Sequence, residues 1–206
     1  MKVTNPKVTK LEQQKGRRKS WSVFVDEEFV FALDEVDLLY YKLSEGNEIS
    51  PQRLEYIRDQ VVLSKANQKA LDFLSYRPRT VKEVEKKLSA EYASDIIARV
   101  MDMLYEYKYV DDALYALEYA KERVNAGYGP FKIEWELKGR GVEQGLIDTA
   151  IESVRADFVK SAIAALRFKY REKPILDSVE KGRAYNFLMR RGFEMDTVDE
   201  ALRSRG

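Results

Sequence analysis

The chain has 206 residues, of which 45% are hydrophobic and 34% are charged, and it carries a formal net charge of only +1. It contains no cysteine and no histidine, which excludes disulfide bonds and cysteine-based metal sites and removes the commonest general base of enzymes. With only 10 glycines and 5 prolines, the composition favours a helical protein with solvated outer faces over a turn-rich β protein.

Several signatures of enzymes and membrane proteins are absent from the sequence. Neither G-x-x-x-x-G-K-[ST] nor G-x-G-x-x-G occurs, so the two common nucleotide-binding loops are missing. The N-terminus lacks the apolar core of a signal peptide, and no apolar run approaches the length that spans a membrane. We therefore expect a soluble, cytoplasmic protein that is not an enzyme and uses no cofactor or metal.

The first 34 residues predict a small antiparallel sheet. Three stretches, 8–14, 20–26 and 29–33, are separated by short turns, and their β-branched and aromatic residues indicate two or three antiparallel strands. The second of these turns is expected at Glu27 and Glu28. Because so small a sheet is marginal by itself, we expect it to pack against a helix that begins near Asp34.

Four basic residues lie together in the expected turn between the first two strands: Lys15, Arg17, Arg18 and Lys19. They could bind the phosphate backbone of a nucleic acid. They could equally form a solvated turn that protects an edge strand from pairing with another chain. The sequence leaves both interpretations open.

From Ser50 onward the chain has the spacing and end signals of helices. Ser50-Pro51 is a typical helix start, and Pro78 prevents that helix from continuing. Thr80 and Glu83 form a capping box for the next helix. Later helices are expected over 94–107, over 112–126, from Pro130 to Gly141 and over 143–154, with breaks in the last third at Pro174, at Gly182 or nearby, and at Gly192.

Two segments of the chain, 136–150 and 187–201, resemble each other. Seven residue pairs match at a single offset: Leu137 with Leu188, Arg140 with Arg191, Gly141 with Gly192, Val142 with Phe193, Glu143 with Glu194, Ile147 with Val198, and Ala150 with Ala201. Residues 84–104 fit the same plan more loosely. Each unit is predicted to hold three helices and cannot bury its apolar face alone, so neighbouring units should stack. Chance similarity among amphipathic helices is the alternative.

These patterns predict a mainly α protein with three tandem three-helix repeats and a small N-terminal antiparallel sheet. The expected parts are a β-rich extension with a short helix over 1–49, a connecting helix over 50–67, and three-helix units over 68–108, 112–154 and 158–204.

Four motifs in the middle of the chain are distinctive. The first is Y-[LIV]-D-D-x-x-[FY]-A, which fits Tyr109-Val110-Asp111-Asp112 and Tyr115-Ala116. The second contains Arg123, Gly127 and Gly129, and the third contains Ile133, Leu137, Gly141 and Val142. The fourth lies upstream and contains Ala70, Leu71, Arg77, Arg79, Glu83 and Leu88. Together they resemble the RecX family over about 66–154, and more loosely to the end of the chain. Trp135 and Lys108 depart from the family pattern, which has a polar residue and glycine there.

The resemblance implies three tandem three-helix repeats and a regulator that binds the RecA–DNA filament. It implies inhibition, in the main, of recombinase and ATPase activity during DNA repair and the SOS response. It also implies no catalytic residue. We expect a monomer that makes at most weak contact with DNA and has no membrane partner. Two other hypotheses are a DNA-binding protein with helix-turn-helix-like units, which the small net charge weakens, and an adaptor for some other protein.

Asp111 and Asp112 could suggest a metal site. Adjacent residues on a helix point about 100° apart and chelate one ion poorly, so we interpret these two as an N-cap and a first-turn acid. The four glycines of the helical part that are expected just after helix ends, rather than in a phosphate loop, are Gly127, Gly129, Gly141 and Gly192. The motif residues interpreted as structural also include Arg123, Ile133 and Leu137.

Three arginines, Arg140, Arg190 and Arg191, lie at matching helix ends in two repeats. They could complement the negative end of the helix dipole or form a basic row that faces a filament. With Lys15, Arg17, Arg18 and Lys19 they make the hypothetical filament-binding set. Because its helix is apolar on two faces, Trp135 is expected to be buried, and we place Tyr105, Tyr115 and Tyr119 in the core or at its edge.

Overall fold

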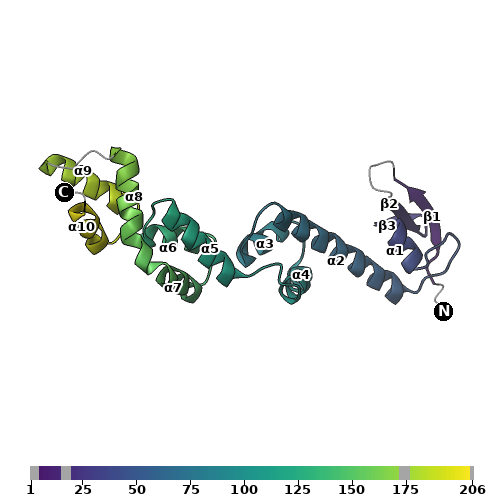
Figure 1. The fold of residues 1–206 in the computed structure, drawn as a ribbon. Coiled ribbons are helices and arrows are strands. Elements are labelled where there is room, and N and C mark those ends of the chain that lie inside the picture. Colours follow the sequence, from purple (N-terminus) through teal and green to yellow (C-terminus); the bar gives the residue numbers. More distant parts are fainter. Residues whose placement is uncertain (1–4, 15–19, 172–176, 205–206) are drawn as a thin grey trace. The chain divides into compact units, whose positions relative to one another are not determined.

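The computed structural model describes residues 5–14, 20–171 and 177–204, and it is mainly helical with one small antiparallel sheet (Figure 1). The predicted fold class is confirmed. The chain divides into two compact units, the first with residues up to 72 and 91–100, the second with residues 73–90 and those from 101 onward. Among the described residues, no helix has both the length and the apolar character needed to cross a lipid bilayer.

The sheet of the first unit contains β1 (Val8–Gln13), β2 (Ser20–Val25) and β3 (Glu28–Asp34) in the antiparallel order β1-β2-β3. Alternate side chains along the strands point to one face, which is buried. They form a core with residues from the following segments, and its buried members are Val8, Val23, Val25, Phe31, Leu33, Leu43, Ile49, Ile57 and Val61.

The turn between β2 and β3 lies one residue earlier than the sequence predicted. Asp26 and Glu27 are the turn residues, with φ of 50° and 70°, and Glu28 already pairs with Val25. A two-residue turn with two positive φ angles matches the right-handed twist of the flanking strands, which explains why the strands meet there. The expected turn at Glu27 and Glu28 was therefore wrong by one position.

Two helices follow the sheet in the chain. The short helix α1 (Glu35–Tyr40) is capped by Asp34, whose carboxylate accepts from the Asp37 N–H at 2.8 Å. Helix α2 (Pro51–Ser75) is a single 25-residue helix that starts at proline, as expected, and its first part lies against the sheet and α1 (Figure 1). It runs without a break through the predicted connecting helix and into the first predicted repeat.

The described residues after α2 form a series of short helices: α3 (Val81–Leu88), α4 (Ser94–Glu106), α5 (Asp112–Asn125), α6 (Pro130–Gly139), α7 (Gln144–Ser153), the 3₁₀ turn η1 (Arg155–Asp157), α8 (Phe158–Tyr170), α9 (Ser178–Arg190) and α10 (Met195–Arg203). The capping box of Thr80 and Glu83 is present at the start of α3, as predicted. The expected break at Gly182 was wrong, because α9 runs through it and one glycine only weakens a helix. Pro174 lies outside the described residues.

The two segments that resemble each other in sequence also have equivalent positions in the structure. Arg140 and Arg191 are the C-cap residues of α6 and α9, and Gly141 and Gly192 follow with φ of 79° and 83°. The apolar partners of the alignment are all buried: Leu137 and Leu188, Val142 and Phe193, Ile147 and Val198, Ala150 and Ala201. One continuous core joins α5–α7 to α8–α10, so these two triplets stack as predicted.

The turn of each later triplet contacts the start of the second helix in the preceding one. The Thr80 hydroxyl, at the N-cap of α3, donates to the Arg140 carbonyl at 2.7 Å. The Gly129 N–H, at the N-cap of α6, donates to the Arg191 carbonyl at 2.9 Å. Two equivalent positions thus make equivalent contacts, which fixes how successive triplets pack.

Gly129 corrects one sequence interpretation. It is the N-cap of α6 with φ of −92°, and not a left-handed residue after a helix. A side chain is excluded there by close packing, because a Cβ atom would lie 2.3 Å from the Gly192 carbonyl oxygen. Gly127, Gly141 and Gly192 do have the expected positive φ.

Candidate partner-binding surface

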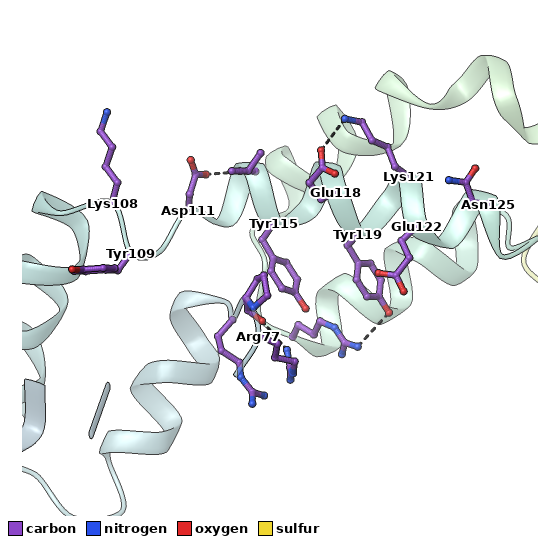
Figure 2. A pocket seen from close by; sticks show the side chains of 14 residues that line it. Arg77, Lys108, Tyr109, Asp111, Tyr115, Glu118, Tyr119, Lys121, Glu122 and Asn125 are labelled. Atoms are coloured by element: carbon purple, nitrogen blue, oxygen red, sulfur yellow. Dashed lines mark hydrogen bonds and ion pairs between the residues drawn. The ribbon is translucent and has the colours of Figure 1, made fainter. Parts of the chain in front are cut away.

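The second unit contains a groove of about 950 Å³ along one side of α5 (Figure 2). Its lining comes from the segment before α3, the segment before α5, α5 itself and the end of α6. The lining residues are Arg77, Pro78, Arg79, Lys108, Tyr109, Asp111, Leu114, Tyr115, Glu118, Tyr119, Lys121, Glu122, Asn125 and Arg140. The groove therefore brings together side chains that lie far apart in the sequence.

Two hydrogen bonds hold the segment before α3 beside α5 and α6. One is the bond from Thr80 to the Arg140 carbonyl described above. In the other, the Val81 N–H at the start of α3 donates to the Asp112 carboxylate at 2.9 Å. Because both bonds join residues at helix ends, the walls of the groove are placed by rigid elements.

Three arginines form one side of the groove. Arg77 makes an ion pair with Glu83 at 2.8 Å, and Arg79 stacks over the Phe73 ring at 4.0 Å. Arg140 stacks over the Tyr119 ring at 4.8 Å and donates to its hydroxyl at 3.3 Å. Within the described residues, the buried Nε atoms of Arg79 and Arg140 have no hydrogen-bond partner. Arg77, Arg79 and Arg140 thus place three positive charges along this side of the groove, two of them held against aromatic rings.

Helix α5 supplies the aromatic floor. Tyr115 and Tyr119 are one helical turn apart and their rings stack at 6.0 Å between centroids, with an angle of 10° between planes. Figure 2 shows both rings pointing to the side of α5 on which Arg77 lies. The exposed side chains of Tyr109 and Leu114 also line the groove.

A polar network that includes Glu136 and Arg123 positions Tyr119. The Glu136 carboxylate accepts from the Tyr119 hydroxyl at 2.8 Å and from Arg123 at 2.7 Å. Burial, together with the hydrogen bond to Glu136, raises the pKa of Tyr119 to about 12. Tyr119 therefore stays protonated at neutral pH and orients the Arg140 guanidinium above it. Arg123 takes part in this network through its ion pair with Glu136.

Acidic side chains also line the groove. Glu118 and Glu122 project from α5, and Asp111 lies at its start. Glu118 is paired with Lys121 at 2.8 Å, whereas Asp111 caps α5 by accepting from the Leu114 N–H at 2.8 Å. The capping interpretation of Asp111 is confirmed. No cluster suited to a metal ion occurs in the part of the chain that the structure describes.

The arginines of the hypothetical filament-binding set differ in their exposure and in the hydrogen bonds that their side chains make. Arg140 lines the groove, and Arg190 is exposed at the end of α9. Arg191 donates to the carbonyls of Ala126 and Gly127 at 2.9 Å each, so its guanidinium is engaged in packing between triplets. The remaining members, Lys15, Arg17, Arg18 and Lys19, lie outside the described residues.

Two expectations about aromatic residues were wrong. Trp135 is 68% exposed with Lys132 stacked over its ring at 4.2 Å, because only the face of α6 that carries Ile133 and Leu137 is packed. Tyr105 is 52% exposed, although Tyr115 and Tyr119 do lie at the core edge. The groove itself was not predicted; its one sequence signal was the pair of arginines before the capping box, Arg77 and Arg79.

Comparisons with known proteins cover the described fold from end to end. The RecX N-terminal domain matches residues 6–50, and the first, second and third RecX three-helix domains match 66–104, 111–151 and 157–202. A regulatory protein RecX from Bacillus licheniformis is 33% identical over 201 residues, which cover 96% of this chain and 76% of that protein. The chain belongs to the RecX family.

Solved structures agree with this family assignment. A crystal structure of a regulatory protein RecX has a TM-score of 0.67 at 24% identity and covers 97% of this chain and 99% of that one, which shows the shared fold. The crystal structure of RecX from Lactobacillus salivarius has a TM-score of 0.61 at 26% identity and covers 69% of this chain and 95% of that one. Since RecX relatives are named as regulatory proteins, a regulatory role is supported for this member.

Proposed function

We propose that this protein regulates the RecA recombinase by binding the RecA–DNA filament, and that it mainly inhibits recombinase and ATPase activity in DNA repair and the damage response. The observation that carries the proposal is the end-to-end match to the four RecX domains. The protein acts as a cytoplasmic monomer, by binding and without catalytic chemistry or a cofactor.

Basic residues provide contacts for such a filament, which carries polyanionic DNA. Arg140, Arg190 and Arg191, with Lys15, Arg17, Arg18 and Lys19, are the proposed contributors. Each contact is weak, but contacts on one chain combine through their effective concentration. Arg190 is the sharpest probe of this set, because it is exposed and Arg191 is held in packing.

The proposal is tested with RecA filaments on single-stranded DNA. We expect the protein to lower the rate of ATP hydrolysis and to bind the filaments more tightly than it binds bare DNA across a salt series. Arg18→Glu combined with Arg190→Glu should weaken inhibition more than either change alone and should reduce its salt sensitivity, since fewer ionic contacts remain to be screened. Arg155→Glu, which alters an exposed pair with Glu152, is the control.

Three results would contradict parts of the proposal. Unchanged ATP hydrolysis and no filament binding would remove the RecA assignment. Equal affinity for bare DNA and for filaments would favour the direct DNA-binding protein with helix-turn-helix-like units. Full potency of the folded double variant would remove Arg18 and Arg190 from the contact surface.

A further inference from the structure

We propose that the groove beside α5 is a docking site for a protein segment that carries charges of both signs next to an apolar side chain. The inference rests on the proposed function, since the segment would belong to a protein subunit of the bound filament. It assigns that contact to side chains of the first and second triplets, most of which lie outside the basic set considered above.

The arginine side of the groove supplies sites for carboxylates. Arg140 donates one hydrogen bond to Tyr119 from its Nη2, and the side chains of Arg79 and Arg140 both line the groove. The Arg79 guanidinium is held in place by stacking over the Phe73 ring, and the Arg140 guanidinium by stacking over the Tyr119 ring. A preorganised arginine fork binds a carboxylate with little further loss of side-chain freedom.

The other lining side chains supply sites for cations and for an apolar group. Glu122 is an exposed carboxylate on α5, and Glu118 lies one turn before it. Leu114 is 55% exposed and Tyr109 is 53% exposed, and both line the groove. An apolar side chain that covers Leu114 would remove its surface from water and would set the register of the flanking charges.

This mixture of charges favours a protein segment over a nucleic acid strand. A strand carries only negative charge along its backbone, so it would bring phosphates close to Glu118, Glu122 and Asp111. A segment with both signs can pair its acids with the arginines and its bases with Glu122, whereas Glu118 is paired with Lys121 and Asp111 caps α5. The net charge of +1 for the whole chain agrees with a protein partner.

Charge changes on the two sides of the groove distinguish these occupants. The variants are Arg140→Gln and Glu122→Lys, and the controls make the same changes outside the groove, at Arg155→Gln and Glu200→Lys. If a segment with both signs binds, each groove variant should weaken binding to RecA filaments by about tenfold, as the loss of a charge-assisted hydrogen bond does. The controls should bind as the unmodified protein does. Circular dichroism and thermal melting establish that each variant is folded.

Leu114→Ser gives a second test that does not depend on Arg140, which also stacks in the fold. It should weaken filament binding and leave the melting temperature unchanged, because Leu114 is exposed.

Other results overturn the inference. If Arg140→Gln weakens binding but Glu122→Lys strengthens it, the occupant is a polyanion such as a nucleic acid strand. If the unmodified protein binds filaments and all three groove variants bind equally well, the groove is no docking site while the proposed function stands. If the unmodified protein does not bind filaments, the proposed function fails and the inference falls with it.

Discussion

Adjacent acids can have separate structural tasks, as Asp111 and Asp112 show. Asp111 caps its own helix, α5, as the sequence indicated. Asp112 was expected to act on the same helix end, but its carboxylate accepts from Val81 at the start of α3. The physical reason is the divergence of neighbouring side chains on a helix, which directs Asp112 toward another helix N-terminus.

The free energy of unfolding of the Asp112→Asn variant should increase relative to that of the unmodified protein as pH rises. Burial raises the pKa of Asp112, with nearby Asp111, Glu83 and Glu85 acting in the same direction, while the Val81 hydrogen bond opposes them. When the pKa of a carboxyl group is higher in the folded state than in the unfolded state, the group stabilises the fold at pH values below its unfolded-state pKa. This stabilisation is lost as pH rises through the folded-state pKa. Asparagine keeps the acceptor but never ionises. Urea unfolding at several pH values between about 3 and 7 measures the difference.

Two comparisons complete that experiment. Asp112→Ala removes the acceptor for Val81 and should cost about 1 kcal/mol in the free energy of unfolding, as loss of a cap does. A difference between the asparagine variant and the unmodified protein that stays constant over the whole pH range would show that Asp112 does not titrate as burial implies.

At the scale of the element, tight turns decide how triplets of helices pack. The turn after α9 lies against the start of α6, and the Phe131 N–H donates to the Gly192 carbonyl at 3.0 Å. Gly129 is needed here for space. Gly182, within α9, has open space where a side chain would lie.

Gly129→Ala and Gly182→Ala should therefore have opposite effects. The first places a methyl group against the turn at Gly192 and should lower the free energy of unfolding by about 1–3 kcal/mol, the usual cost of overpacking. The second should raise it by about 0.5–1 kcal/mol, because alanine favours a helix interior over glycine. Urea unfolding of both variants tests the pair. Similar effects of the two changes would refute the close-packing role of Gly129.

At the scale of the whole molecule, stability is shared between neighbouring triplets. The buried side chains of α5–α7 and α8–α10 form one cluster that extends from Ala116 to Ala201. A single triplet has too little apolar surface to fold well alone, as is usual for repeat proteins. The two triplets together contain a core of their own.

A fragment of residues 107–206 should therefore fold, whereas a fragment of residues 107–154 should not. The longer fragment keeps the joint core and the Asp111 cap. The shorter one exposes the side chains that pack against α8–α10. Circular dichroism and urea unfolding should show a cooperative transition for the longer fragment alone. A cooperative transition of similar midpoint in the shorter fragment would mean that each triplet is stable independently.

By itself the sequence determined the features that depend on neighbours along the chain. The helix start at Pro51 and the N-caps Thr80 and Asp111 follow from capping chemistry. The R-G turn of two repeats follows from the left-handed residue that a helix end needs. The family motifs extended this local information to the fold class. These signals can be read without coordinates because they act over a few residues.

Only the tertiary structure decided the features that depend on residues distant in sequence. The contact between Gly129 and Gly192, the capping of α3 by Asp112 and the groove beside α5 each join residues of different helices. Trp135 shows the same limit, since the periodicity of α6 marks two apolar faces but not which one a neighbour covers. Packing removes water from one face and leaves the other in solvent, and that choice is made between helices, not within one.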